Sequence, residues 1–201
     1  MRHDPDLQGE LFSQPATPTP PAPEGLRYWP DVVTAGDEAD LAARLAELPF
    51  KPYEFRGYLG NRRTVAFGLR YDDGRHALED AAAPPEFLAE LRDRVAGLAG
   101  LPPSDFAHVL INEYAPGAGI GWHRDRPRFE FVAGVSLLTP CVMRFRRKAG
   151  ERWERAFAPL APRSAYLLSG PARNEWQHSI TPLETLRYSI TFRTLAGATR
   201  G

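Results

Sequence analysis

The sequence predicts a mainly β fold of the α+β class, an antiparallel sandwich or barrel with two N-terminal helices packed on one side. Two helical periodicities occur in the first half of the chain, and short β-type runs broken by Gly and Pro follow Gly100. Strands and helices do not alternate in the second half. This argues against a doubly wound parallel sheet and favours strands that pair with antiparallel neighbours.

The first helix is expected over residues 37–48. Thr34 and Asp37 form a possible capping box before a face of apolar residues spaced three and four apart. A second helix is expected to start after the two prolines at 84–85 and to stop at Gly100. The apolar faces consist of Leu41, Leu45 and Leu48 in the first helix and of Phe87, Leu88, Leu91, Val95 and Leu98 in the second.

Six runs after Gly100 combine β-branched or aromatic residues with flanking turn residues, and each is expected to be a strand. They are residues 107–114, 131–138, 141–147, 152–158, 164–169 and 187–194.

Residues 1–24 are expected to be a disordered proline-rich tail, followed by one domain over residues 25–201. The tail holds six prolines and little that folding would bury, so ordering it would cost more entropy than burial returns. The whole chain of 201 residues has the size of one domain with a tail.

No apolar run approaches the roughly 18 residues of a membrane-spanning helix, and the N-terminus lacks the apolar segment of a signal peptide. The single cysteine, Cys141, excludes an internal disulfide and a Cys-rich zinc site. We therefore expect a cytoplasmic protein without a membrane partner. Nothing in the sequence indicates an obligate dimer, so a monomer is expected.

The formal net charge is zero, but the charge is unevenly distributed. Residues 1–100 carry a net charge of −6, and residues 101–201 carry +6. Arginine supplies 23 of the 25 basic residues, which suits bidentate recognition of phosphate or carboxylate, although codon bias explains it equally well. The neutral total therefore does not exclude an anionic partner.

His123 and Asp125 are candidate metal ligands. In an extended segment residues i and i+2 share a face, so the two side chains can reach one point. With His178 they would complete the two-His-one-carboxylate set of non-haem Fe(II) oxygenases. Taken singly, the His-x-Asp pair also fits a surface turn, and His178 also fits a hydrogen-bonded turn residue.

The run from Arg187 to Arg193 has a period of two. One face carries Arg187, Ser189, Thr191 and Arg193, and the other carries three apolar residues. Arginines that face the interior would need an anion, whereas an outward arginine face would leave the apolar side buried. The two arginines lie about 20 Å apart along a strand, so they would bind different groups.

Asn112 and Tyr114 alternate on the strand that leads into the His-x-Asp segment. Both fall on one face of that strand, where they either enter the same pocket or face water at the strand end.

These elements in this order resemble the AlkB family of Fe(II)- and 2-oxoglutarate-dependent dioxygenases. The match covers residues 107–195 and rests on Asn112-x-Tyr114-x-Pro116-Gly117, His123-x-Asp125, His178 and the run RYSITFR at 187–193. The resemblance implies a double-stranded β-helix, or jelly roll, that uses Fe(II), 2-oxoglutarate and O2. The implied iron ligands are His123, Asp125 and His178, and the implied 2-oxoglutarate residues are Asn112, Tyr114, Arg187, Ser189 and Arg193, with Arg187 on the distal carboxylate.

The resemblance also implies oxidative demethylation of N-alkylated bases in DNA or RNA, with release of formaldehyde, succinate and CO2. A flipped base needs aromatic faces, and its backbone needs cations. The expected substrate residues are Tyr58, Arg62, Phe67, Tyr71 and Trp122, and a further phosphate-facing surface is possible at Arg126, Arg128, Arg144, Arg146, Arg147, Lys148, Arg152 and Arg155. Taken singly, the aromatics also fit core positions and the cations a solvated hairpin tip.

Two departures put the substrate in doubt. Pro127 stands where some repair members carry an acidic residue that helps to read the damaged base, and Ser189 stands where some have Asn. The alternatives are the same chemistry on a tRNA modification or a methylated protein side chain and, more remotely, a non-catalytic jelly-roll binding module.

Overall fold

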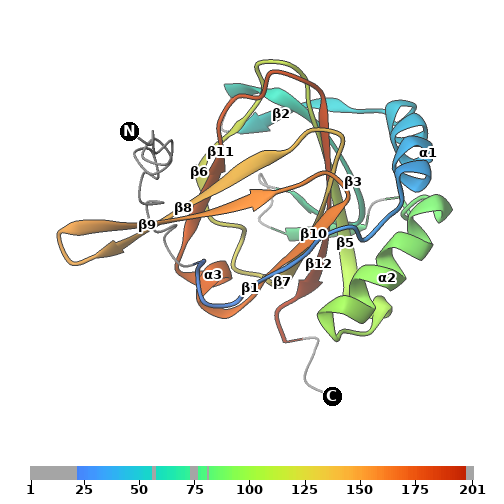
Figure 1. The fold of residues 1–201 in the computed structure, drawn as a ribbon. Helices are drawn as coiled ribbons and strands as arrows, with labels where there is room; N and C mark the ends of the chain where they lie inside the picture. Colours follow the sequence, from blue (N-terminus) through green and yellow to red (C-terminus); the bar gives the residue numbers. More distant parts are fainter. Residues whose placement is uncertain (1–21, 56–57, 73–76, 81, 198–201) are drawn as a thin grey trace, which may run out of the picture.

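Two antiparallel sheets face each other across an apolar layer in the computed structural model, which describes residues 22–55, 58–72, 77–80 and 82–197 (Figure 1). The architecture is a jelly roll with helices on one side, so the predicted fold class is confirmed. The proposed tail lies almost wholly outside the described residues.

The larger sheet has eight strands, in the order β1-β10-β7-β12-β5-β3-β2 with β4 paired to β3. Its strands are β1 (Leu26–Trp29), β2 (Lys51–Phe55), β3 (Tyr58–Asp72), β4 (Ala77–Asp80), β5 (Phe106–Tyr114), β7 (Phe129–Leu137), β10 (Ser164–Leu168) and β12 (Arg187–Leu195). The smaller sheet has the order β6-β11-β8-β9. Its strands are β6 (Ile120–His123), β11 (Gln177–Ile180), β8 (Cys141–Ala149) and β9 (Arg152–Leu160).

Two long helices cover the outer face of the larger sheet. Helix α1 (Ala35–Ala46) starts at the predicted capping box, where Thr34 Oγ1 accepts a hydrogen bond of 3.1 Å from the Asp37 amide. Helix α2 (Ala89–Ala99) follows a 3₁₀ turn (Glu86–Leu88) and ends at Gly100, whose φ of 73° is left-handed. Both helices are confirmed, with ends shifted by a few residues. No helix in the described part of the chain is long and apolar enough to cross a bilayer.

All six predicted runs are strands. Each of them is long enough for its sequence to show a period. Strands β1, β2, β3, β4, β6 and β11 and the short helix α3 (Gly170–Asn174) were not predicted. Most of these elements are only four or five residues long, so they hold too few residues to show a period.

Strand β12 lies between β5 and β7, and both of its faces are buried. Tyr188, Ile190 and Phe192 join the core cluster beneath α1 and α2. Arg187 and Arg193 therefore point into the space between the two sheets. The alternative in which these arginines face solvent is wrong.

Candidate metal and cosubstrate site

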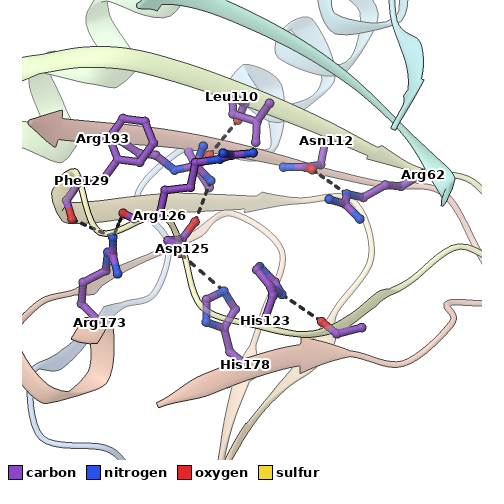
Figure 2. A network of polar contacts seen from close by, with 12 residues as sticks. Arg62, Leu110, Asn112, His123, Asp125, Arg126, Phe129, Arg173, His178 and Arg193 are labelled. Carbon is purple, nitrogen blue, oxygen red and sulfur yellow. Dashed lines mark hydrogen bonds and ion pairs between the residues drawn. The ribbon is translucent and has the colours of Figure 1, made fainter. Parts of the chain in front are cut away.

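His123 and His178 face each other across neighbouring strands of the smaller sheet. They are register partners on β6 and β11, so both rings leave the same face, with centroids 4.3 Å apart. Asp125 follows two residues after His123, and its Oδ2 lies 3.6 Å from Nε2 of His178 (Figure 2). The structure thus brings the three predicted ligand residues together between the sheets.

The protonation states of the three side chains suit a divalent cation. Burial lowers the pKa of His178 to about 3 and also lowers the pKa of His123. Burial alone would raise the pKa of Asp125, but the nearby cation of Arg193 and the two imidazoles outweigh it and hold that pKa well below its usual range. At neutral pH the donors are therefore two neutral imidazoles and one carboxylate, the set found at Fe(II) centres.

Two contacts orient these donors. Nδ1 of His123 lies 2.9 Å from the carbonyl oxygen of Gly121, a contact that leaves Nε2 as the nitrogen with a free lone pair. Arg193 donates a hydrogen bond of 3.1 Å to Oδ1 of Asp125 (Figure 2).

The three side chains are neighbours and not a closed cage. Among the described residues no three His, Cys, Asp or Glu side chains are grouped so that they could hold a metal as they stand. Asp125 is turned towards Arg193 and His178, so it must adjust its side chain to share an ion with His123. The donor chemistry fits Fe(II), while final ligation requires that adjustment.

Arg187 carries a buried charge without a counterion. It is fully buried at the start of β12, and its Nε donates a hydrogen bond of 3.1 Å to Ser136 Oγ. Its other two nitrogens have no partner, and the ring of Tyr114 lies 5.2 Å away. A buried, unpaired guanidinium is costly unless an anion binds it. The site therefore fits a carboxylate ligand.

The other predicted cosubstrate residues line the same face. Ser189 is the register partner of Asn112 on β5 and of Ser136 on β7, and both Ser189 and Asn112 are buried. Asn112 Oδ1 accepts a hydrogen bond of 3.1 Å from Nε of Arg62, which is also buried. Burial raises the pKa of Tyr114, so its hydroxyl remains a neutral donor.

The predicted substrate residues divide into three groups. Arg62 lies at the site, beside Asn112. Tyr58 and Tyr71 belong to β3, but their side chains lie outside the described structure. Phe67 lies outside the site, so its expected role as a substrate residue is wrong. Trp122 lies outside the metal site, and its expected role in substrate binding stays a prediction.

Strand alternation explains both placements. Phe67 packs into the core cluster beneath the helices, on the face of β3 opposite to that of Arg62. Trp122 directly precedes His123 and therefore projects from the other face of β6, where the guanidinium of Arg146 lies 4.4 Å from its ring.

Arg173 is a buried residue at the site that the sequence did not reveal. It reaches from α3 and donates hydrogen bonds to the carbonyl oxygens of Arg126 and Phe129, the latter at 2.7 Å (Figure 2). Arg173 thereby fixes the turn that follows Asp125. No motif marked it, because its partners are backbone atoms distant in sequence.

His108 is the second residue that sequence reasoning missed. It is buried, stacks on Phe129 with ring centroids 5.1 Å apart, and contacts the carbonyl oxygen of Leu69 through Nδ1. Its register partner on β12 is Arg193. The period of two that singled out Asn112 and Tyr114 also passes through position 108, so this signal was present.

Comparisons with known proteins agree with this geometry. The family model of the 2OG-Fe(II) oxygenase superfamily matches residues 25–193. The chain is 28% identical over 185 residues to the "Alkylated DNA repair protein ALKBH8 homolog" of Arabidopsis thaliana, covering 78% of this chain and 50% of that protein. It is 28% identical over 149 residues to the "Probable RNA/DNA demethylase ALKBH6" of Danio rerio, covering 74% and 60%. The chain thus spans between half and three-fifths of the length of these two relatives.

Solved structures share the fold. The structure of OsALKBH1 superposes with a TM-score of 0.66 at 15% identity, over 85% of this chain and 96% of that one. A 2OG-Fe(II) oxygenase family oxidoreductase from Burkholderia pseudomallei gives a TM-score of 0.59 at 17% identity, over 85% of each chain. The predicted family resemblance is confirmed. The chain belongs to the 2OG-Fe(II) oxygenase superfamily as an AlkB-like member, a family of dioxygenases that use Fe(II), 2-oxoglutarate and O2.

Proposed function

We propose that this protein oxidatively demethylates N-alkylated bases in DNA or RNA and releases formaldehyde, succinate and CO2. The observation that carries the proposal is the fully buried guanidinium of Arg187, which has two unpaired nitrogens and shares the inter-sheet space with the imidazoles and carboxylate. A chain that buries such a charge needs a carboxylate ligand, and 2-oxoglutarate supplies one at its distal end.

His123, Asp125 and His178 would hold Fe(II), which when bound couples oxidative decarboxylation of 2-oxoglutarate to hydroxylation of the substrate. Arg187 would bind the distal carboxylate through the two nitrogens that lack partners. Arg193 keeps Asp125 ionised and oriented. The burial of these groups excludes water from the reacting atoms.

The substrate class follows from the relatives and from the charge of the pocket. The two curated relatives are named for repair of alkylated DNA and for RNA/DNA demethylation. Arg62 is a buried cation, its guanidinium lies 3.8 Å from the ring of Tyr53, and no carboxylate among the described side chains pairs with it. Pro127 stands where some repair members carry an acidic residue that contacts the damaged base, so this site lacks that negative charge. We therefore propose that neutral N-methylated bases are better substrates than cationic ones.

A panel assay tests the proposed substrate. Succinate and formaldehyde are measured with single-stranded oligonucleotides that carry one methylated base, either cationic (1-methyladenine, 3-methylcytosine) or neutral (3-methyluracil, N6-methyladenine). Methyl-lysine peptides serve as the alternative substrate. We expect formaldehyde with the oligonucleotides only, and most of it from the neutral bases. Formaldehyde from the peptides alone would contradict the proposal.

Nothing in the sequence indicates an obligate dimer, so we also propose that the active protein is a monomer. With one cysteine in the sequence, a reducing cytoplasm is its proposed location. We further propose that residues 1–24 act as a tail outside the catalytic domain.

A further inference from the structure

The outer face of the smaller sheet is the face opposite to the metal-site imidazoles. On the β8–β9 hairpin, Cys141, Met143 and Phe145 point into the core. The residues between and after these three therefore point to the outer face, and so do their cross-strand partners on β9. That set consists of Val142, Arg144, Arg146, Lys148, Trp153, Arg155, Phe157 and Pro159. It contains four cations and no carboxylate, and Trp122 extends it on β6. We call these residues together with Trp122 the outer basic surface.

Neutral partners hold the central arginines of this surface. Arg144 Nε donates a hydrogen bond of 3.1 Å to Ser179 Oγ, and Arg146 Nε donates one of 2.7 Å to Gln177 Oε1. The guanidinium of Arg146 also lies between two indoles, 4.4 Å from the Trp122 ring and 4.5 Å from the Trp153 ring. These contacts fix the position of the guanidinium without neutralising its charge.

The opposite face of the same hairpin shows how this fold neutralises an arginine. Arg147 pairs with Glu154 and with Glu175, each at 2.6 Å. No carboxylate within the described part of the chain forms such a pair with Arg144, Arg146, Lys148 or Arg155. The cations predicted from the sequence as one basic group are thus sorted by strand alternation. On this hairpin Arg147 is neutralised by two carboxylates, whereas the four outer-face cations keep their charge available.

We propose that the outer basic surface binds a single-stranded segment of the nucleic acid that flanks the base under reaction. The uncompensated cations match a row of phosphates, and the exposed rings of Trp153 and Phe157 offer faces on which bases stack. A polyanion that carries aromatic bases satisfies both features at once. This inference rests on the proposed function.

The surface lies beside the route to the metal site. Strand β6 is an edge of the smaller sheet, and on it Trp122 of the outer face is directly followed by His123 of the inner face. A strand bound across Trp122 can therefore pass around the β6 edge towards the imidazoles. The β8–β9 hairpin projects beyond the rest of the smaller sheet in Figure 1 and so lengthens the surface along the strand direction.

The test uses a double variant that combines Lys148→Glu with Arg155→Glu, and it is compared with the wild type. Both residues are exposed, so the change is not expected to disturb the core. The matched control is Arg44→Glu combined with Arg92→Glu, which places the same charge change on α1 and α2. The readout is fluorescence anisotropy of a labelled, unmethylated single-stranded oligonucleotide over a series of salt concentrations. Thermal unfolding checks the fold of each variant.

We expect the outer-face double variant to bind the oligonucleotide about tenfold more weakly. The log–log slope of affinity against salt concentration should shrink by about 0.7 for each phosphate that the variant no longer neutralises. Trp153→Leu should weaken binding while leaving that slope unchanged, because it removes stacking and no charge. The control variant should bind like the wild type.

Wild-type affinity in the outer-face variant, or an equal loss in the control, would overturn the proposed surface. The proposal would also fail if the outer-face variant bound the oligonucleotide like the wild type and lost only its binding to phosphatidylserine vesicles, or changed only its oligomeric state. These results leave the proposed function intact if methylated oligonucleotides still yield formaldehyde. The opposite failure, with oligonucleotide binding through this surface but formaldehyde only from peptides, would overturn the function separately.

Discussion

The two faces of the smaller sheet carry opposite chemistry on residues that are neighbours in sequence. On the inner face, His123 and His178 lose their charge to burial and lie beside one carboxylate. On the outer face, Arg146 keeps its charge and is held by indole rings and an amide. The inner face is suited to a metal and the outer face to an extended anion.

The comparison shows how strongly the period of two determines function in a β protein. A register slip of one residue would exchange the two faces, placing Trp122 in the site and His123 in solvent. Burial then determines which side chains are charged, because an inward group must be neutral or paired, whereas an outward group can remain charged. The predictions below test first the inner groups and then the residues that support them.

The largest expected effect is on the inner face at Asp125. Asp125→Ala removes the anionic member of the ligand set, and loss of succinate formation should exceed the roughly 100-fold cost of removing an outer-shell partner. Succinate release with excess Fe(II) measures it, and Asp93→Ala, an exposed aspartate on α2, is the control. Wild-type turnover by Asp125→Ala would exclude this carboxylate as a ligand.

The two arginines of β12 should respond in opposite directions to the same change. Arg193→Met leaves buried Asp125 without its cation and should lower the free energy of unfolding by about 3 to 5 kcal/mol. Arg187→Met replaces an unpaired buried charge with an apolar chain and should raise it by about 1 to 4 kcal/mol. Urea unfolding without 2-oxoglutarate measures both. Shifts of the same sign would show that Arg187 already has a partner in the protein.

Arg173 tests whether the turn after Asp125 must be held. Arg173→Leu removes the donors to the carbonyl oxygens of Arg126 and Phe129 and should weaken Fe(II) binding by about 10- to 100-fold. Anaerobic Fe(II) titration measures the affinity. Arg92→Leu, on the surface of α2, is the control. Equal Fe(II) affinity in the wild type and Arg173→Leu would reduce Arg173 to a packing residue.

The effect that should vanish at neutral pH concerns His108. Burial lowers its pKa to about 4, whereas the unfolded chain takes up a proton near pH 6.5. The free energy of unfolding should therefore fall as the pH drops below about 6.5 and stop falling on this account near 4, a loss of up to about 3 kcal/mol. His108→Gln keeps a donor for the Leu69 carbonyl oxygen. It should reduce the pH dependence of the unfolding free energy by the equivalent of up to one bound proton. An identical pH profile in both proteins would contradict the assignment.

Both helices and half of the strands could be predicted, because amphipathic elements repeat their pattern several times, whereas β3, the longest strand, was missed although its length gives room for a period. Both helices and all six predicted strands exist. Strands β6 and β11 could not be predicted, since four residues give no period and their pairing joins segments more than 50 residues apart. The meeting of His123 with His178 is a consequence of that long-range pairing.

The site was predicted unevenly for a related physical reason. Ligand and cosubstrate candidates carry their own chemistry in a motif, whereas Arg173 acts on backbone atoms that any sequence supplies. The outward position of Trp122 follows from the rule that joined His123 to Asp125, because that rule also sends the residue before His123 to the opposite face. Phe67 was misplaced because aromatic residues of a core and of a binding pocket look alike in sequence.

The most direct measurement is an anaerobic titration of the protein with Fe(II) and 2-oxoglutarate, followed by the metal-to-ligand charge-transfer absorption of the bound pair. The account predicts a band that saturates at one equivalent in the wild type, is absent in Asp125→Ala, and requires a large excess of 2-oxoglutarate in Arg187→Met. A wild-type chain without the band, or an Arg187→Met variant that saturates like the wild type, would contradict it.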